Sequence, residues 1–478
     1  MKKILILLLI AFAFASCTQT GSNCPTPCKC VCDTIPPPKD TVTAAPFFFG
    51  CNSNHWQPKE KQIQFSGIRL YLPIGWVWTA NGFYGDPFLQ AQKQFLGLDQ
   101  YLTYMKGKNR DVLLTLMQSP DYLNGHTAGW LTNDWPPVRP GADKNDPRSY
   151  SEIASIYKAL AIRYGSKQWP EGSYRVDPAP PRWNGDERQV YKSGLDLVKT
   201  IEIGNEEDSW WNQDWYMTAE QYAAMLMTCY DSIKVADPKM QVTMCGLTNL
   251  DFVYLEKMRI WFSAKGRAFL SDAIQVHRYN NRGNLPGVHP PTWTTDGAVP
   301  VEIDPGISDF QKVMDFARLV GKPVFVSEYG YDTRPGTWAS PTPVSGKTLE
   351  ELQAQWVTRA ALEYARMGAA RVYCFTMADE PNPDGGLYNS SGLLYGEARG
   401  YAPKPAFTAA TSLIASLAGL TLKKDESSAT ARILRFEGND NTTSVYWSPT
   451  MTGASFQAVV GEQSVTVTEA PQSFRLGQ

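Results

Sequence analysis

Two glutamates of this 478-residue chain follow short apolar runs and are far apart in the sequence. Glu206 follows the run at 200–204 in KTIEIGNEED, and Glu328 follows the run at 323–327 in PVFVSEYGYDT. β-Branched residues in both runs favour strands, so each acid is expected at the end of a strand. Glu206 by itself could be a solvated turn acid, whereas a surface acid in place of Glu328 would more naturally fall inside a polar loop. Together they are candidates for carboxylates that do chemistry.

Two carboxylates that face one cavity can cleave a glycosidic bond with retention of configuration. One carboxylate attacks the anomeric carbon, and the other protonates the leaving oxygen and later activates water. The second carboxylic acid must stay protonated near neutral pH, which burial and an anionic neighbour can arrange. Such a role requires that the fold bring both residues to one site.

Eight short apolar runs alternate with helical patterns and would supply the scaffold. They begin at residues 47, 68, 112, 200, 241, 273, 323 and 371. Continuously apolar strands must be covered on both faces, so the alternation predicts an α/β fold of the (β/α)₈ TIM-barrel type. Only about seventeen residues join the first two runs, which leaves little room for a first helix. A doubly wound open sheet is the alternative, but its phosphate-binding glycine fingerprint is absent.

Helix starts and domain limits can also be read from the sequence. Three pairs fit a capping box at a helix start: Thr218 with Gln221, Ser308 with Gln311, and Thr348 with Glu351. A helix is expected over 404–420, and the last sixty or so residues alternate polar and apolar. We therefore expect the barrel over 46–420 and a small antiparallel β-sandwich domain over 421–478.

Chemistry in a TIM barrel is found at the carboxyl ends of the strands. Besides the two glutamates, this places Arg69, Asn205, His277 and Tyr279 among the candidate site residues. Glu202 shares strand parity with Glu206, so we expect it to point inward, pair with a base and be structural.

The segments EIGNEE and VSEYGYD resemble the strand-four and strand-seven motifs of clan A retaining glycoside hydrolases. The resemblance covers roughly residues 46–420 and implies that Glu206 is the acid/base and Glu328 the nucleophile. It further implies that Asn205 binds the 2-hydroxyl of the substrate and that Arg69 supports the nucleophile. Either His277 or Tyr279 would orient the nucleophile. Departures from the clan's pattern at Gly204, at Glu207 and in FTMADE after the eighth strand leave the family and the substrate open.

Aromatic residues and long loops suggest how a carbohydrate would be bound. Aromatic residues make up 12% of the chain, and Trp76 and Trp210 are expected to stack on sugar rings. Long insertions at 73–95, 118–148 and 278–306 predict an open groove and an endo-acting enzyme. An exo-acting enzyme of the same clan and a non-catalytic glycan-binding lipoprotein are the alternatives.

Composition excludes other classes of function. The formal charge is −2, so no basic field would attract nucleic acid. The four histidines are His55, His126, His277 and His289, and no two of them are close in sequence. We therefore expect no metal site and no cofactor. A monomer whose partner is its carbohydrate substrate is the expected state.

The N-terminus has the pattern of a targeting segment. Lys2 and Lys3 precede an apolar run too short to span a membrane, followed by Phe14-Ala15-Ser16-Cys17. This tetrad resembles the lipobox of bacterial lipoproteins, which implies a signal peptide over 1–16 and lipidation of Cys17. A Cys- and Pro-rich linker over 17–45 would then tether the protein to the outer membrane of a bacterial cell envelope, facing the periplasm or the surface.

The cysteines of CPTPCKCVC favour disulfides over a zinc site, and Cys229, Cys245 and Cys374 are expected in the core.

Overall fold

The computed structural model describes residues 45–85, 97–125, 135–180, 188–438 and 441–476. All of these belong to one compact unit, Val42–Gln478. The expected signal peptide, the lipidation site Cys17 and the N-terminal cysteine cluster lie outside the described residues. Among the described helices, none has the length and apolar character needed to cross a membrane.

Eight parallel strands form the central sheet, in the order β7-β6-β5-β2-β1-β10-β9-β8. The two outer strands of this order are joined by a bridge between Leu247, which follows β7, and Val276 of β8, so the sheet approaches closure. The predicted TIM barrel is confirmed, and each of the eight apolar runs contributes one strand. The strands are β1 (Phe49–Ser53), β2 (Gly67–Pro73), β5 (Asp111–Met117), β6 (Thr200–Ile203), β7 (Gln241–Met244), β8 (Ile274–His277), β9 (Val324–Tyr329) and β10 (Arg371–Cys374).

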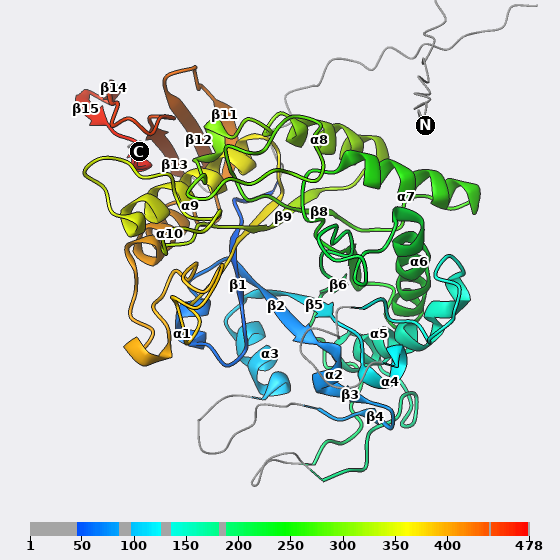
Figure 1. Ribbon diagram of the computed structural model, residues 1–478. Coiled ribbons are helices and arrows are strands. Elements are labelled where there is room, and N and C mark those ends of the chain that lie inside the picture. Colours follow the sequence, from blue (N-terminus) through cyan, green and yellow to red (C-terminus); the bar gives the residue numbers. More distant parts are fainter. Residues whose placement is uncertain (1–44, 86–96, 126–134, 181–187, 439–440, 477–478) are drawn as a thin grey trace, which may run out of the picture. The chain divides into compact units, whose positions relative to one another are not determined.

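Helices surround the strands in Figure 1. Between β1 and β2 there is only the four-residue α1, as the short spacing predicts. The longer helices are α3 (Leu98–Gly107), α5 (Ser151–Tyr164), α6 (Ala219–Ala236), α7 (Phe252–Ala264), α8 (Asp309–Val320), α9 (Leu349–Arg366) and α10 (Pro405–Ser416). Short elements complete the barrel region: α1 (Lys59–Gln62), α2 (Ile74–Val77), α4 (Asp121–Asn124), β3 (Trp78–Thr79), β4 (Gly82–Phe83), η1 (Pro147–Tyr150), η2 (Val301–Ile303) and η3 (Glu397–Arg399).

Two of the three predicted capping boxes are present. The boxes headed by Thr218 and Thr348 begin α6 and α9. The box at Ser308 is wrong, because that residue already has a helical backbone, with φ −59° and ψ −25°, and its side chain makes no capping hydrogen bond. An N-cap side chain reaches the next turn from an extended backbone, which Ser308 lacks.

The C-terminal strands form two antiparallel sheets. One has the order β11-β12-β13-β16, and the other is the hairpin β14–β15. Their bounds are β11 (Thr421–Asp425), β12 (Arg432–Gly438), β13 (Asn441–Trp447), β14 (Phe456–Val460), β15 (Gln463–Val467) and β16 (Gln472–Leu476). Tyr446 of the first sheet packs with Ala458 and Val467 of the hairpin in a small apolar cluster, as expected for a small sandwich.

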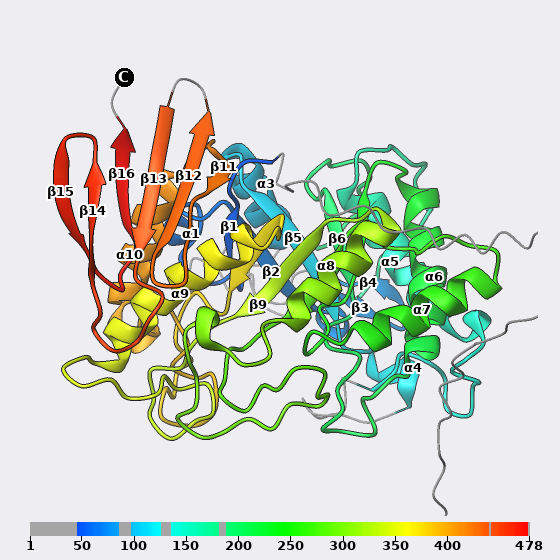
Figure 2. The same cartoon turned by 90° about the horizontal axis from the view of Figure 1, so that it is seen from above.

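The other face of the four-stranded sheet joins the main core. Leu434, Phe436 and Trp447 are fully buried in the same cluster as the barrel residues. Figure 2 shows this sheet beside α9 and α10. The expected core cysteines Cys229, Cys245 and Cys374 are buried and free.

Candidate active site

Glu328 lies in β9 at the carboxyl end of the barrel strands and is buried, with 7% of its side chain exposed. Arg69 Nη1 and Tyr71 Oη, both from β2, donate to its Oε1 at 2.7 and 2.5 Å. Tyr279 Oη, beyond β8, donates to its Oε2 at 2.8 Å. Both carboxylate oxygens are therefore held by donors from the walls of the barrel.

These donors decide the charge of Glu328. Burial by itself would raise the pKa of Glu328, but the charges of His277 and Arg69 and the tyrosine hydrogen bonds outweigh it. The pKa of Glu328 therefore lies below its usual value, and the group is an ionised carboxylate.

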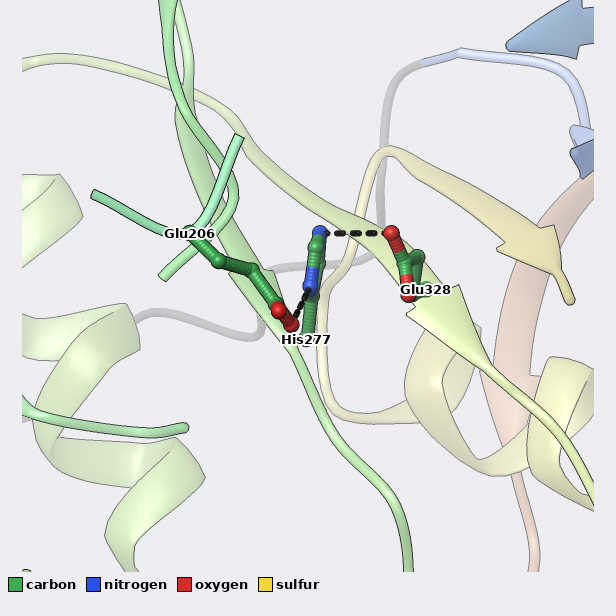
Figure 3. Close-up of side chains that lie close together, drawn as sticks. All are labelled: Glu206, His277 and Glu328. Carbon is green, nitrogen blue, oxygen red and sulfur yellow. Dashed lines mark hydrogen bonds and ion pairs between the residues drawn. The ribbon is translucent and has the colours of Figure 1, made fainter. Parts of the chain in front are cut away.

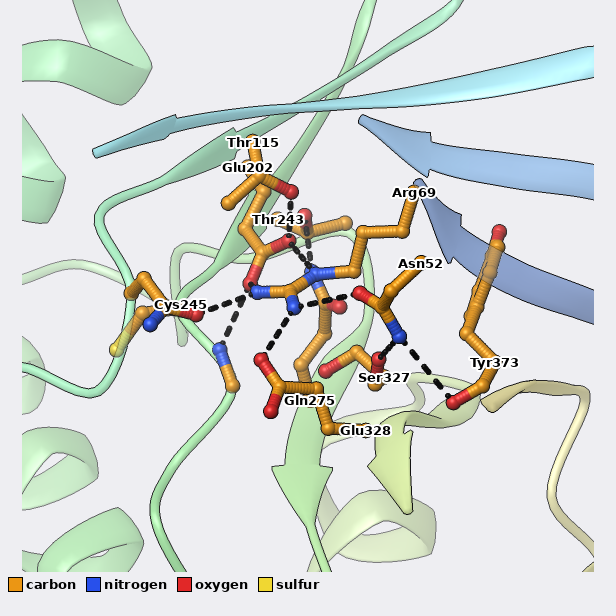
Figure 4. A network of polar contacts seen from close by, with 12 residues as sticks. Asn52, Arg69, Thr115, Glu202, Thr243, Cys245, Gln275, Ser327, Glu328 and Tyr373 are labelled. Carbon is orange, nitrogen blue, oxygen red and sulfur yellow. Dashed lines mark hydrogen bonds and ion pairs between the residues drawn. The ribbon is translucent and has the colours of Figure 1, made fainter. Parts of the chain in front are cut away.

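Arg69 itself is fixed by a buried ion pair beneath the site (Figure 4). Its Nε and Nη2 donate to the two oxygens of Glu202 at 2.7 and 2.8 Å, and both side chains are fully buried. Thr115 Oγ1 also donates to Glu202, at 2.7 Å. Such a bidentate pair fixes the plane of the guanidinium, which leaves Nη1 aimed at Glu328. The expected inward orientation and structural pairing of Glu202 are confirmed.

Glu206 is placed by the turn that ends β6 (Thr200–Ile203). Gly204 has a φ of +78°, and a Cβ there would lie 2.3 Å from the carboxylate of Glu207. Glu207 points toward α6. Burial and the charge of Glu207 both raise the pKa of the Cys229 thiol of that helix. Glu206 has a left-handed backbone, with φ +55°, and donates its N–H to Gly246 O at 3.1 Å. The turn thus sends two adjacent glutamates in different directions.

His277, the last residue of β8, lies between the two candidate carboxylates (Figure 3). Its Nδ1 is 2.6 Å from Glu206 Oε1, and its Nε2 is 3.4 Å from Glu328 Oε1. Burial opposes a charged imidazole, but Glu328 and Glu206 outweigh it and raise the pKa of His277. An oxygen of Glu206, a ring nitrogen of His277 and an oxygen of Glu328 all lie within 4.8 Å of one another.

That geometry also defines the one place among the described residues where three such donor atoms could hold a metal ion. In the structure both ring nitrogens of His277 face carboxylate oxygens, which suits a proton shared between imidazole and carboxylates.

Asn205 adjoins this pair. Its Oδ1 accepts from Arg69 Nη2 at 2.7 Å. Because an amide carries its donor opposite its acceptor, this contact turns Nδ2 of Asn205 away from Arg69. A ligand hydroxyl at the carboxylate pair could accept from that group.

A row of aromatic rings extends from Tyr279. Tyr279 makes a T-shaped contact with Trp338 and a tilted contact with Tyr388, and Trp338 stacks on Trp293 with centroids 3.9 Å apart. Trp293 in turn lies 6.1 Å from the ring of Trp210. The expected sugar-binding residue Trp210 therefore joins the site through this row.

Trp76 lies elsewhere. Its ring packs 5.9 Å from that of Trp56, in the segments that follow β2 and β1. The structure thus brings Glu206, Glu328, Asn205, Arg69, His277 and Tyr279 into one hydrogen-bonded cluster, with Trp210 at the end of an aromatic row and Trp76 in a separate pair.

Three residues of the cluster were missed from the sequence. Tyr71 is two residues after Arg69 on β2, and this period-2 spacing could have placed it on the same face. Asn52 of β1, which accepts from Arg69 Nη1 at 3.0 Å, is at a strand end like the other site residues. Gly246 gave no signal, yet a Cβ there would lie 2.1 Å from His277 Nε2.

Comparison with known proteins finds similar folds among solved structures. No protein-family model matches the chain, and no curated protein matches it. Among solved structures, it is similar to a family 39 glycoside hydrolase from Bacteroides cellulosilyticus WH2, with a TM-score of 0.59, 15% identity, and 91% of this chain and 81% of that chain covered. It is also similar to a glucosidase from Croceicoccus marinus, with a TM-score of 0.51, 12% identity, and coverage of 91% and 83%. A family 30 endoxylanase from Clostridium papyrosolvens C71 has a TM-score of 0.50, 12% identity, and coverage of 91% and 98%. At these identities the likeness shows the fold alone, which is the TIM barrel.

Proposed function

We propose that the protein is a retaining glycoside hydrolase in which Glu328 is the nucleophile and Glu206 the acid/base. The observation that carries the proposal is the approach of the two carboxylates to within 4.8 Å at the carboxyl ends of β6 and β9. Retaining enzymes hold their carboxyl groups about 5–5.5 Å apart, whereas inverting enzymes need about 6.5–9.5 Å for an intervening water.

The environments of the two acids support this division of roles. Glu328 is buried among donors that favour its ionised form, which a nucleophile requires. Glu206 is three times as exposed, with 22% of its side chain accessible, so water can reach it in the second step. Glu206 would protonate the leaving oxygen while Glu328 bonds to the anomeric carbon, and would then take a proton from the water that releases the sugar.

Stereochemistry tests the proposal directly. Proton NMR of the reaction before mutarotation should give a product with the anomeric configuration of the substrate. An inverted product would refute the retaining assignment, and failure to cleave any member of a broad glycan panel would favour the glycan-binding alternative. Activity that is lost on chelation and restored by zinc or calcium would instead support a metal at the same three residues.

Azide separates the two glutamates. With a dinitrophenyl glycoside, Glu206→Ala should still form the glycosyl-enzyme, because this leaving group needs no protonation, and azide should then give a glycosyl azide of retained configuration. Glu328→Ala with azide should give the inverted product. Glu207→Ala is the matched control, since its side chain points toward α6. A retained azide from the Glu207 variant with an active Glu206 variant would move the acid/base by one residue.

We propose further that the enzyme is endo-acting on a poly- or oligosaccharide. The aromatic row from Tyr279 to Trp210 supports this, because it offers stacking faces beyond the sugar ring held at the carboxylates. Oligosaccharides of several lengths should appear at the earliest time points. Monosaccharide alone would indicate an exo-acting enzyme.

The sequence supports a place for the enzyme in the bacterial cell envelope, anchored to the outer membrane through Cys17, as a monomer. Metabolic labelling with a palmitate analogue should modify the wild type but not Cys17→Ser. Labelling of both proteins, or of neither, would contradict the anchor.

A further inference from the structure

The segment 246–248, which follows β7 (Gln241–Met244), touches the candidate site at three successive residues. Gly246 accepts the N–H of Glu206 at 3.1 Å and donates its own N–H to Glu202 at 2.9 Å. The carbonyl of Leu247 accepts the N–H of His277 at 2.7 Å. One short segment therefore fixes the backbone on both sides of the contact between Glu206 and His277.

The third residue, Thr248, binds a carboxylate two positions after Glu206. Its N–H donates to both oxygens of Asp208, at 3.0 and 3.1 Å, and its Oγ1 donates at 2.9 Å. Asp208 is 5% exposed, and burial raises its pKa to about 7 against these hydrogen bonds. Burial disfavours the charged form of Asp208, and both of its oxygens accept from Thr248. This contact ties the turn after β6 to the segment after β7.

Glu206 needs such a tie because its backbone is in the left-handed region, which a residue with a Cβ seldom adopts. A strained backbone persists only where its surroundings over-determine it. The turn is held at Glu206 by Gly246, at the Glu206 carbonyl by the hydroxyl of Ser209, and at Asp208 by Thr248.

We propose that Asp208, acting through Thr248, is a positioning residue that holds Glu206 against His277 for its acid/base role. This rests on the proposed function of Glu206. Asp208 does not itself touch the substrate, because both of its oxygens face Thr248.

The test compares glycosides of one sugar whose leaving groups differ in acidity, and measures kcat/KM, which reports the step that Glu206 assists as an acid. In Asp208→Asn the amide keeps the shape of the side chain but turns a donor toward Thr248. We expect kcat/KM to fall about 100-fold for a poor leaving group such as an alkyl glycoside, the cost of misplacing a catalytic group by about 1 Å. For the dinitrophenyl glycoside the fall should be less than about 3-fold, because that group leaves without a proton.

Thr248 supplies the second arm of the test. Thr248→Val removes one of the three hydrogen bonds and should shift the leaving-group dependence in the same direction by a smaller factor. Thr248→Ser keeps the hydroxyl and should have the leaving-group dependence of the wild type. The double variant Asp208→Asn with Thr248→Val should be no more selective than Asp208→Asn alone, since the two residues act as one contact.

Asp237 is a matched control at the opposite ends of the strands. It is equally buried and accepts from Ser166 Oγ at 2.9 Å and from the N–H of Lys239 at 3.0 Å, just before β7 begins. Asp237→Asn should lower the melting temperature and leave the ratio of the two kcat/KM values unchanged.

The inference is overturned if Asp208→Asn or Thr248→Val lowers kcat/KM equally for the two glycosides, or leaves both values unchanged, while Glu206→Ala lowers kcat/KM more for the alkyl glycoside. Should Asp208→Asn fail to fold, the Val and Ser variants of Thr248 decide the matter. If Glu206→Ala itself does not discriminate, the failure lies in the proposed role of Glu206.

Discussion

The two candidate catalytic glutamates have the same side chain and opposite surroundings. Glu328 accepts from an arginine and two tyrosines inside the barrel, whereas the carboxylate of Glu206 makes its hydrogen bond with the imidazole of His277. Placing one acid among fixed donors and the other beside a titratable group is how one fold separates a nucleophile from an acid/base.

At this scale Tyr71 should control the acidic limit of activity. Tyr71→Phe removes a donor to Glu328 that lowers its pKa, so the pKa of Glu328 should rise. A hydrogen bond to a charged group contributes about 1.5–3 kcal/mol, which corresponds to about 1–2 pH units. The acidic limb of kcat/KM against pH should therefore move up by that amount. Tyr164→Phe is the control, because Tyr164 donates to a carboxylate on the far side of the barrel wall, Asp99, at 2.9 Å. An unmoved limb in Tyr71→Phe would contradict the assignment of Glu328.

His277 should make stability depend on pH. Its folded pKa is raised above 6.5, so its stabilising contacts are fully present below pH 6.5 and are lost as the pH rises through the folded pKa. The pKa of Glu328 is lowered below 4.5, so its contribution is present above pH 4.5 and is lost as the pH falls. The difference in free energy of unfolding between the wild type and His277→Asn should thus be largest between pH 4.5 and 6.5, at about 1.5–3 kcal/mol. This difference should become smaller as the pH rises above 6.5. Urea unfolding from pH 4 to 9 measures it, and a gap that is equal at pH 5 and pH 9 would refute this account.

At the scale of elements, the site is assembled from strand ends that the helices hold in place. β2 supplies both Arg69 and Tyr71, β6 leads into Glu206, β8 ends at His277, and β9 contains Glu328. Because these side chains come from four strands, the register of the barrel sets the distances between them. α6 follows the turn of Glu206, and its start is fixed by a capping box at Thr218.

The two helix starts that look alike in sequence should respond differently. Thr218→Ala removes a real N-cap and should cost about 1 kcal/mol of stability. Ser308→Ala should cost little, because that side chain makes no capping hydrogen bond. Chemical denaturation of the two variants side by side measures both values. Equal losses would show that the helix start at Asp309 is capped in solution.

At the scale of the molecule, the C-terminal sheet is part of the barrel's core. Trp447 Nε1 donates to Glu302 Oε1 at 2.6 Å, and Arg359 of α9 binds the same carboxylate through two nitrogens, both at 2.9 Å. The Arg359 and Glu302 side chains are almost completely buried. Removing the C-terminal sheet would take away one hydrogen-bond partner of this buried ion pair, which should destabilise the fold.

A chain that ends at residue 420 should therefore lose the fold of the barrel. It would expose the Glu302–Arg359 pair and the core faces that Leu434 and Phe436 cover. Calorimetry of the full chain should give one cooperative transition, and the truncated chain should aggregate or melt at a much lower temperature. A truncated chain with wild-type melting and activity would show instead that the sheet is an independent appendage.

The sequence by itself determined the alternation of strands and helices, and with it the barrel, because apolar runs and helical patterns are local and each run recurs as a strand. It also pointed to the two glutamates, since an acid near the end of an apolar run can be recognised from the sequence alone. It could not distinguish the two capping boxes from the one at Ser308, because capping depends on a backbone angle that the preceding turn sets.

Only the tertiary structure decided how the acids are paired and held. The sequence left His277 and Tyr279 as alternatives, whereas the structure gives both a contact with Glu328 and only His277 a hydrogen bond with Glu206. The tertiary structure also brings Tyr71 and Gly246 to the site. It places Asp208 in a hydrogen bond with Thr248, which is forty residues away in the sequence. These contacts arise where strands distant in the chain end side by side, and no local pattern encodes which side chains will then be within hydrogen-bonding distance.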